Sequence, residues 1–248
     1  MPFINHLGLA LVLLAATPQD EPPPKPGEAA KVAPATKPDH LPDEGQASLA
    51  PGQIVEPSRI EEARSTLPLP LLYGQPRLQE GVFVEYELTG PQGKARVRAA
   101  SVGRAIRENV PVQQIEFEFL DLGQPAFVVL WLTESEPVQL DRVAAWAPPH
   151  TPVSIPIDLP VGHPQLRGEQ VKVEEVEVRG PFAGKARRVV YDLGDSKSVE
   201  VTLSDHVPLF GVLSVRRGEE QWTAVAFGDG AQRALNKVPL AMPRAKGL

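Results

Sequence analysis

The stretch VEVTLSDHVPLFGVLSVRR, from Val199 to Arg217, reads like a pair of β-strands except at its centre. There SDHVPLFG places a His, a Pro and a Gly among hydrophobic residues. Pro208 has no N–H to donate to a strand ladder, so it belongs at a strand start or a sheet edge. Gly211 permits a tight bend. We therefore predict a turn between two strands, with His206 exposed at the rim.

Alternation of apolar and polar residues recurs along most of the chain, in segments bounded by Gly, Pro, Asp and Asn. This pattern is typical of antiparallel strands that bury one face. Spacings of about 10–13 residues leave no room for crossover helices. We predict a mainly β fold, a single antiparallel meander of about ten strands that forms a strongly curved sheet or half-barrel with a short N-terminal helix. The strands are expected at Val82–Leu88, Lys94–Val102, Gln114–Phe119, Ala126–Thr133, Val138–Trp146, Gln170–Val178, Lys185–Tyr191, Lys197–Leu203, Leu209–Val215 and Gln221–Phe227.

Two details of this arrangement follow from composition. The segment Ala126–Thr133 is apolar on both faces and is expected to be a central strand. The Pro-rich segment Ala147–Pro164 is expected to join two halves of the meander, each of about five strands.

Helical signals are few. Ser58 followed by Glu61 is a capping-box pattern, and predicts a helix from about Arg59 to Thr66. A second helical pattern, AQRAL at 231–235, lies near the C-terminus. After the first helix comes an apolar segment that needs a surface to lie on, and we interpret it as a lid made of Leu67, Leu69, Leu71, Leu72 and Tyr73.

The N-terminal region predicts export. Residues 1–17 contain an apolar run that is too short to span a bilayer but suits a secretory signal; the alternative is an apolar tail on a cytosolic protein. Residues 18–57 are rich in Pro and acidic residues and lack aromatic ones, as in a disordered spacer. Residues 58–248 then form the folded domain, and we expect a periplasmic or extracellular protein with no transmembrane span.

Composition excludes several classes of function. The net charge of −6 makes nucleic acid a poor partner. Short basic clusters such as Arg96 and Arg98 lie beside acidic residues, as on a solvated sheet face. Cysteine is absent, which excludes disulfides, thiolate metal sites and a lipidated N-terminal Cys.

No catalytic constellation is recognisable, so we expect a non-enzymatic protein without cofactor or metal. The folded part has three histidines, His150, His163 and His206, and none has another at metal-ligand spacing. Adjacent residues in an extended chain point to opposite faces, so the Ser204–Asp205–His206 run cannot form a catalytic relay by itself. Glu116 and Glu118 share the face opposite Phe117, and we expect that face to be solvated.

Large aromatic side chains are the remaining candidates for function. They either fill a closed core or line a concave face that the chain covers only partly, where an apolar ligand could bind. The candidate lining residues are Tyr86, Phe117, Phe119, Phe127, Trp131, Phe210, Trp222 and Phe227.

The segment Leu203–Val215 resembles the periplasmic half-barrel carriers of lipids and lipoproteins, of the LolA/LppX type. In it Ser204 and Asp205 match a polar step, Val207 and Pro208 a bend, and LFG at 209–211 the start of the next strand. The preceding GKARRVVYD, at 184–192, matches the neighbouring strand. The resemblance covers about the last third of the chain and implies binding of an acyl chain or another apolar envelope component, without catalysis.

Two functions remain open from the sequence. The first is an exported protein that binds an apolar small molecule, a lipid or a lipoprotein in the concave face of its sheet. The second is a closed β-sandwich or barrel that serves as an interaction or structural module with a protein partner of the cell envelope. An envelope hydrolase is a third class, which would need a buried histidine beside a carboxylate.

Overall fold

The computed structural model describes residues 54–91, 93–107 and 109–242. The predicted signal at 1–17 and almost all of the predicted spacer at 18–57 lie outside these residues. Val55, close to the end of that spacer, is described and buried. Its backbone N–H and C=O both bond to the side-chain amide of Gln165, so Val55 belongs to the folded part.

The described chain forms one sheet of twelve strands with short helices on it, so the prediction of a mainly β, mostly antiparallel fold is confirmed. The predicted single meander is wrong, because β6 and β7 follow each other in the chain but lie near opposite edges of the sheet. The order across the sheet is β12-β6-β5-β4-β3-β2-β1-β11-β10-β9-β8-β7. The helices are α2 (Pro57–Thr66), α3 (Leu69–Tyr73) and α4 (Pro164–Arg167). The strands are β1 (Phe83–Gly90), β2 (Gly93–Arg107), β3 (Val110–Phe119), β4 (Ala126–Thr133), β5 (Gln139–Trp146), β6 (Val153–Pro160), β7 (Glu169–Val178), β8 (Gly184–Gly194), β9 (Lys197–Leu203), β10 (Val212–Arg217), β11 (Glu220–Gly228) and β12 (Leu240–Ala241).

The sequence did not predict β6 and β12, because neither has the alternating pattern of a strand. β6 lies inside the segment that was expected to be a Pro-rich connection. It pairs with β5 along one side, whereas on the other side β12 pairs only with Val153 and Ser154, in parallel. Pro156 pairs with Arg142 of β5 and lies beyond the two residues that β12 contacts, at a nearly free edge where a proline is tolerated. β12 itself has two residues, too few to leave an alternating pattern.

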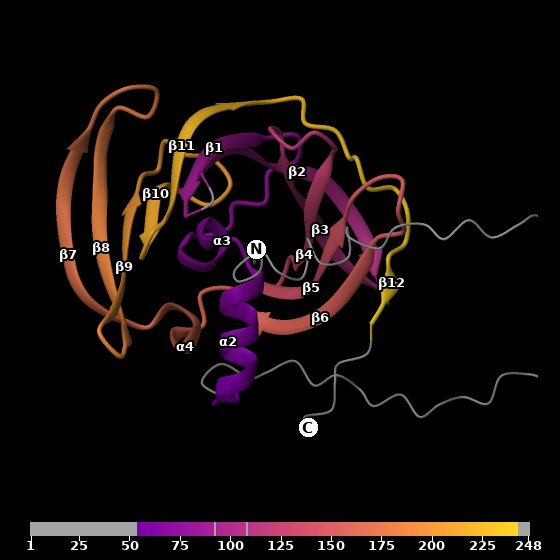
Figure 1. Ribbon diagram of the computed structural model, residues 1–248, viewed down its shortest axis with the longest axis horizontal. Coiled ribbons are helices and arrows are strands. Elements are labelled where there is room, and N and C mark those ends of the chain that lie inside the picture. The colour runs from indigo at the N-terminus through magenta and orange to yellow at the C-terminus, as the bar shows by residue number, and fades with distance from the viewer. Residues whose placement is uncertain (1–53, 92, 108, 243–248) are drawn as a thin grey trace, which may run out of the picture.

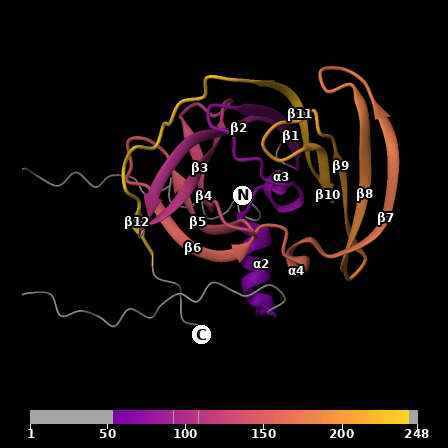
Figure 2. The ribbon, with the colours of Figure 1, turned by 180° about the vertical axis from the view of Figure 1, so that it is seen from behind.

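The two halves of the chain meet at a single seam. Strands β1 to β6 run toward one edge of the sheet and β7 to β11 toward the other, and β1 pairs with β11 in between. The helices α2 and α3 lie between these two groups of strands (Figure 1). The same arrangement is visible from behind (Figure 2). α4 belongs to the connection from β6 to β7, which joins the two sides of the sheet.

Alternation along the strands separates two apolar faces. We call the side that carries α2 and α3 the helix face and the opposite side the back face. Tyr86, Val97 and Phe117 belong to the large buried cluster on the helix face, together with the helices. β4 contributes to both faces, because Leu130 packs in that cluster and Val129 in a smaller one on the back face. The prediction of a central strand at Ala126–Thr133 is therefore confirmed.

The N-terminal helix is confirmed, but the predicted capping box is wrong. α2 begins at Pro57, and its N-cap is Glu56, whose side chain makes no capping bond. Proline suits the first turn of a helix because the N–H groups there have no partner inside the helix. Proline also begins α3, which has Pro68 as its N-cap and Pro70 in its first turn. The segment expected as a lid is thus partly helical.

Part of the back face, over β3 to β5, is covered by the C-terminal segment, which we call the strap and which spans residues 229–239. It runs outside the strands toward β12 (Figures 1 and 2). Leu235 packs there against Phe127, Val129 and Trp131. No helix forms at 231–235, so that helical prediction is wrong: these residues run extended because they make their hydrogen bonds to the sheet.

The strap is fastened by Glu116, which was predicted to be solvated. That prediction is wrong, because the side chain is only 4% exposed. Its carboxylate accepts hydrogen bonds from the backbone N–H groups of Ala234 and Leu235, at 3.0 and 2.9 Å, and from the side-chain amide of Gln114 at 2.7 Å. A buried carboxylate with three donors is well satisfied. Glu118 is half-buried and has only a distant pairing with Arg98, at 3.9 Å.

Replacing Glu116 by Ala should destabilise the fold, since two strap N–H groups and one amide lose their acceptor. We expect a loss of about 3 kcal/mol in the free energy of unfolding, measured by urea titration. Glu118→Ala is the matched control on the same strand and face, and should cost less than about 1 kcal/mol. Equal losses in the two variants would show that Glu116 does not fasten the strap.

Candidate functional site

Four of the predicted lining residues meet on the helix face as a chain of aromatic rings. The ring of Phe117 stacks on that of Phe210, with centroids 5.7 Å apart, and lies edge-on to Trp222 at 6.3 Å. Trp222 in turn lies edge-on to Tyr86 at 5.9 Å. The hydroxyl of Tyr86 donates to the carbonyl of Val212 at 3.3 Å. These offset and edge-on contacts are the geometries that aromatic pairs favour.

The other predicted lining residues are divided among three places. Phe119 is partly buried at the margin of the helix-face cluster. Phe127 and Trp131 lie on the back face under the strap. Phe227 is exposed, with its ring 5.3 Å from that of Phe182 in the β7–β8 turn. The structure therefore brings five of the eight residues near or into one cluster and separates the rest.

The segment predicted to be a lid lies on the helix face. Leu67, Leu69, Leu71, Leu72 and Tyr73 are all buried in its apolar cluster. The ring of Tyr73 is 5.3 Å from that of Tyr191 on β8. Arg167, at the end of α4, donates from Nε to the carbonyl of Leu72 at 2.8 Å and from Nη2 to the carbonyl of Gly74. The end of α3 is thus attached both by apolar packing and by one guanidinium.

The turn between β9 and β10 inserts into the same cluster. The prediction of a turn is confirmed, as is the exposure of His206. Leu209 and Phe210 are buried, and their carbonyls accept from the backbone N–H groups of Arg77 and Gln75, at 2.6 and 2.8 Å. Gly211 has a φ of +67°, and so supplies the left-handed bend that returns the chain to β10.

Gly74 makes this insertion possible by having no side chain. A Cβ at this position would lie 2.5 Å from the carbonyl oxygens of both Phe210 and Pro70. The end of α3 and the turn can therefore touch only because residue 74 is glycine. No sequence pattern predicts the contact between Gly74 and Phe210, because the two residues are far apart in the chain.

α2 is attached to its surroundings by arginines that bind backbone carbonyls. Arg64 donates to the carbonyls of Gln165 and Leu166, at 2.6 and 3.1 Å. Arg217, at the end of β10, donates to the carbonyl of Arg64 at 2.9 Å. Arg59 donates to the carbonyl of Ile157 on β6 at 3.1 Å. These bonds link α2 to both sides of the sheet.

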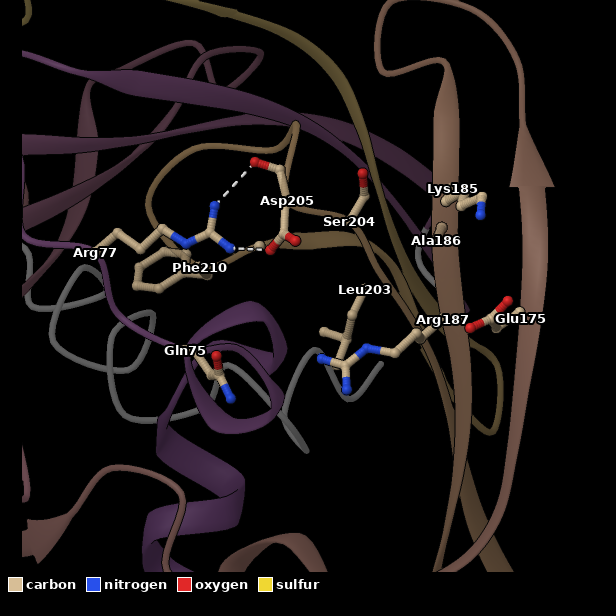
Figure 3. A pocket seen from close by; sticks show the side chains of 11 residues that line it. Gln75, Arg77, Glu175, Lys185, Ala186, Arg187, Leu203, Ser204, Asp205 and Phe210 are labelled. Atoms are coloured by element: carbon tan, nitrogen blue, oxygen red, sulfur yellow. Dashed lines mark hydrogen bonds and ion pairs between the residues drawn. The ribbon is translucent and has the colours of Figure 1, made fainter.

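A small pocket opens at the rim, between the β9–β10 turn and the β7–β8 hairpin (Figure 3). Its volume is about 160 Å³, smaller than most ligand pockets. Arg77 points across it to Asp205, with which it makes an ion pair and a further bond to the backbone carbonyl. Glu175, Lys185 and Arg187 line the other side. The pocket offers charge of both signs beside the apolar side chains of Leu203 and Phe210.

A larger hollow lies between α2 and α4. Its volume is about 640 Å³, within the range of small-molecule sites. Pro57, Ile60 and Pro164 give it an apolar lining, and Arg64 and Glu169 lie at its margin. The hollow borders the helices that cover the helix face.

The histidines do not assemble into a reactive site. His206 is exposed, and the hydroxyl of Ser204 accepts from its backbone N–H rather than from its ring. His163 is buried and caps α4, its Nδ1 accepting from the N–H of Gln165 at 3.3 Å. Within the described ranges no group of three or more His, Asp or Glu side chains could hold a metal ion.

Comparison with known proteins identifies no relative: neither any protein-family model nor any curated protein matches the chain. In the part of the chain that the structure describes, no helix has the length and apolar character that a membrane crossing requires.

Replacing Gly74 by Ala should separate α3 from the β9–β10 turn, because the added Cβ meets backbone on two sides. We expect a loss of about 2–3 kcal/mol in the free energy of unfolding, measured by urea titration. Gly90→Ala is the control: it lies in open space at a hairpin turn and should change the stability by about 0.5 kcal/mol or less. An unchanged Gly74→Ala protein would contradict the close approach.

Proposed function

We propose that this chain is an exported, non-enzymatic carrier that binds an apolar ligand, an acyl chain or a lipoprotein, on the helix face of its sheet. In this account α2, α3 and the β9–β10 turn cover that face when no ligand is bound. The observation that carries the proposal is how little of the chain covers this face: on the apolar side of a sheet of twelve strands lie three short helices and parts of the β7–β8 and β9–β10 turns.

The proposal includes a rolled, half-barrel sheet, and chain length supports it. β6 and β7 are ten strand steps apart across the sheet, which in a flat sheet is about 48 Å. They are joined by residues 161–168, which reach about 30 Å even when fully extended. The sheet must therefore bend toward its helices for the connection to close. A bend in this direction makes the helix face concave.

The way in which the cover is attached also supports a carrier. α2 and the end of α3 are joined to the rest of the fold by guanidinium groups on backbone carbonyls, and by Gln165 on Val55. A bond with a guanidinium donor is worth about 1.5–3 kcal/mol, and water or an anionic group can take the place of the carbonyl. The apolar surface beneath is what the cover protects, and an apolar ligand would protect it equally well.

One flank of the helix face has no cover. Val173 on β7 lies directly opposite Val189 on β8, so the two side chains share a face. Val189 is only 3% exposed, whereas Val173 is 48% exposed. The apolar surface thus continues past the edge of the cover onto the outermost strand. We propose that a ligand enters from this flank, close to the hollow between α2 and α4.

The interaction module remains the second candidate, and one observation favours it. The rings of Tyr86, Trp222, Phe117 and Phe210 pack against each other as they would in a permanently filled core. Native mass spectrometry and lipid extraction of the exported protein separate the two functions. Co-purified lipid supports the carrier, and a ligand-free protein that takes up no amphiphile supports the module.

The positions of the three Trp residues provide a direct test of where a ligand binds. Trp222 lies on the helix face and Trp131 on the back face, with Trp146 stacked on Phe127 nearby. In the double variant Trp131→Phe, Trp146→Phe only Trp222 fluoresces. A brominated fatty acid, which quenches Trp on contact, should strongly quench this variant.

Trp222→Phe is the matched control, because it retains only Trp131 and Trp146, and its fluorescence should change little. Quenching of Trp131 and Trp146 instead would show that the ligand binds on the back face, beneath the strap. The absence of quenching in both variants would exclude a fatty-acid site on either face.

A further inference from the structure

Tyr73 combines burial with an unused hydroxyl. Its side chain is 1% exposed, yet its hydroxyl has no hydrogen-bond partner in the part of the chain that the structure describes. Leaving a buried hydroxyl unpaired is costly, and most buried polar groups in proteins are paired. Tyr86 provides the contrast, since its buried hydroxyl bonds to the carbonyl of Val212. The orphan hydroxyl of Tyr73 therefore needs an explanation.

The positive charges of Arg64, Arg167 and Arg217 act on Tyr73. Arg167 donates to the carbonyls on either side of Tyr73, at Leu72 and Gly74. Arg217 donates to the carbonyl of Arg64, and Arg64 donates to the carbonyls of Gln165 and Leu166 beside Arg167, so the three arginines are linked to one another. Burial raises the pKa of Tyr73 to about 12, although the charges of Arg217, Arg64 and Arg167 all act to lower it. The phenol is thus a neutral donor in a positive environment at physiological pH.

Acidic groups of the described residues balance only part of the positive charge of these three arginines. Arg64 has Glu61 only at 3.9 Å, and Arg217 pairs with Glu220 at 3.2 Å. Arg167 makes no ion pair with the described residues and is satisfied by carbonyls alone. Burial lowers its pKa. A guanidinium has five N–H donors, so each of the three keeps N–H groups for a further acceptor.

We infer that Tyr73, Arg64, Arg167 and Arg217 form a subsite for the anionic head of an amphiphile, a carboxylate or a phosphate ester on an acyl chain. This inference rests on the proposed function and names the chemical class of its ligand. The acyl chain lies on the helix face, and the head accepts from the Tyr73 hydroxyl and from the spare guanidinium N–H groups. Arg64 also lines the hollow between α2 and α4, and we propose that the head reaches the subsite from this hollow.

The decisive variant is Tyr73→Phe. Since it removes an unpaired buried hydroxyl, the urea midpoint should rise or stay unchanged, whereas Tyr86→Phe, which loses a hydrogen bond, should lower it. Binding of decanoate, decyl phosphate and decanol is then measured by isothermal titration calorimetry below their aggregation concentrations. Tyr73→Phe should weaken decanoate and decyl phosphate by about tenfold, the loss expected for one charge-assisted hydrogen bond, and leave decanol unchanged.

Adjacent arginines on β10 supply the control for net charge. Arg217→Gln should reduce the preference for decanoate over decanol. Arg216→Gln removes the same charge from an exposed residue that pairs with Glu200, and should leave the preference unchanged.

The outcomes separate the subsite from the carrier. If all three amphiphiles bind and Tyr73→Phe weakens them equally or not at all, the subsite is wrong and the carrier stands. If none binds, the proposed function fails and the subsite with it. Displacement of decanoate by millimolar inorganic phosphate would show a site for a free anion, and would overturn the inference about an amphiphile.

Discussion

The contact between Phe210 and the end of α3 is the constraint on which the arrangement of the helix face depends. The β9–β10 turn places Phe210 on the helix face of the sheet, where its ring stacks on that of Phe117. Its carbonyl binds the N–H of Gln75, and its backbone touches Gly74. One turn thus joins the strand that supplies Phe117 to the segment that follows α3. Without it, neither the lid nor the aromatic rings would have a fixed position.

This constraint connects structure with the proposed function. The cover of the helix face is apolar on its inside, and polar bonds to carbonyls attach it at its margins. An apolar ligand can replace the first kind of contact, and water or an anionic head can replace the second. Two features of the covered fold are available to a ligand. Val173 exposes apolar surface at the flank, and the buried hydroxyl of Tyr73 has no hydrogen-bond partner among the described residues.

Much of the sheet could be predicted from sequence because alternation is a local signal. Nine of the ten predicted strands overlap the observed ones over most of their length, and the tenth, at Leu209–Val215, overlaps β10 from Val212 onward. β6 was missed because Pro156 resembles a break, and only the neighbouring strand order shows that it lies beside a nearly free edge. The helix predicted at 231–235 was wrong because tertiary hydrogen bonds to Glu116 outweigh local propensity.

The candidate site was less predictable, because it depends on which face each side chain shares. Phe127 and Trp131 lie on a strand that is apolar on both sides, so alternation could not assign them to the back face. In the sequence Glu116 occupies a polar position of an alternating strand, and only its hydrogen bonds to the strap show that it is buried. The subsite proposed at Tyr73 combines residues from α2, α3, α4 and β10, and no pattern within one segment indicates it.

Hydrogen exchange with and without a saturating amphiphile tests the central claim most directly. The account predicts that decanoate speeds exchange in residues 55–63 and 204–211, as these parts of the cover move off the helix face, while Arg64 and Tyr73 hold the head and β3 to β5 remain protected. If those segments exchange at the same rate or more slowly while decanoate is bound, the cover does not move aside, and the helix face is a permanent core.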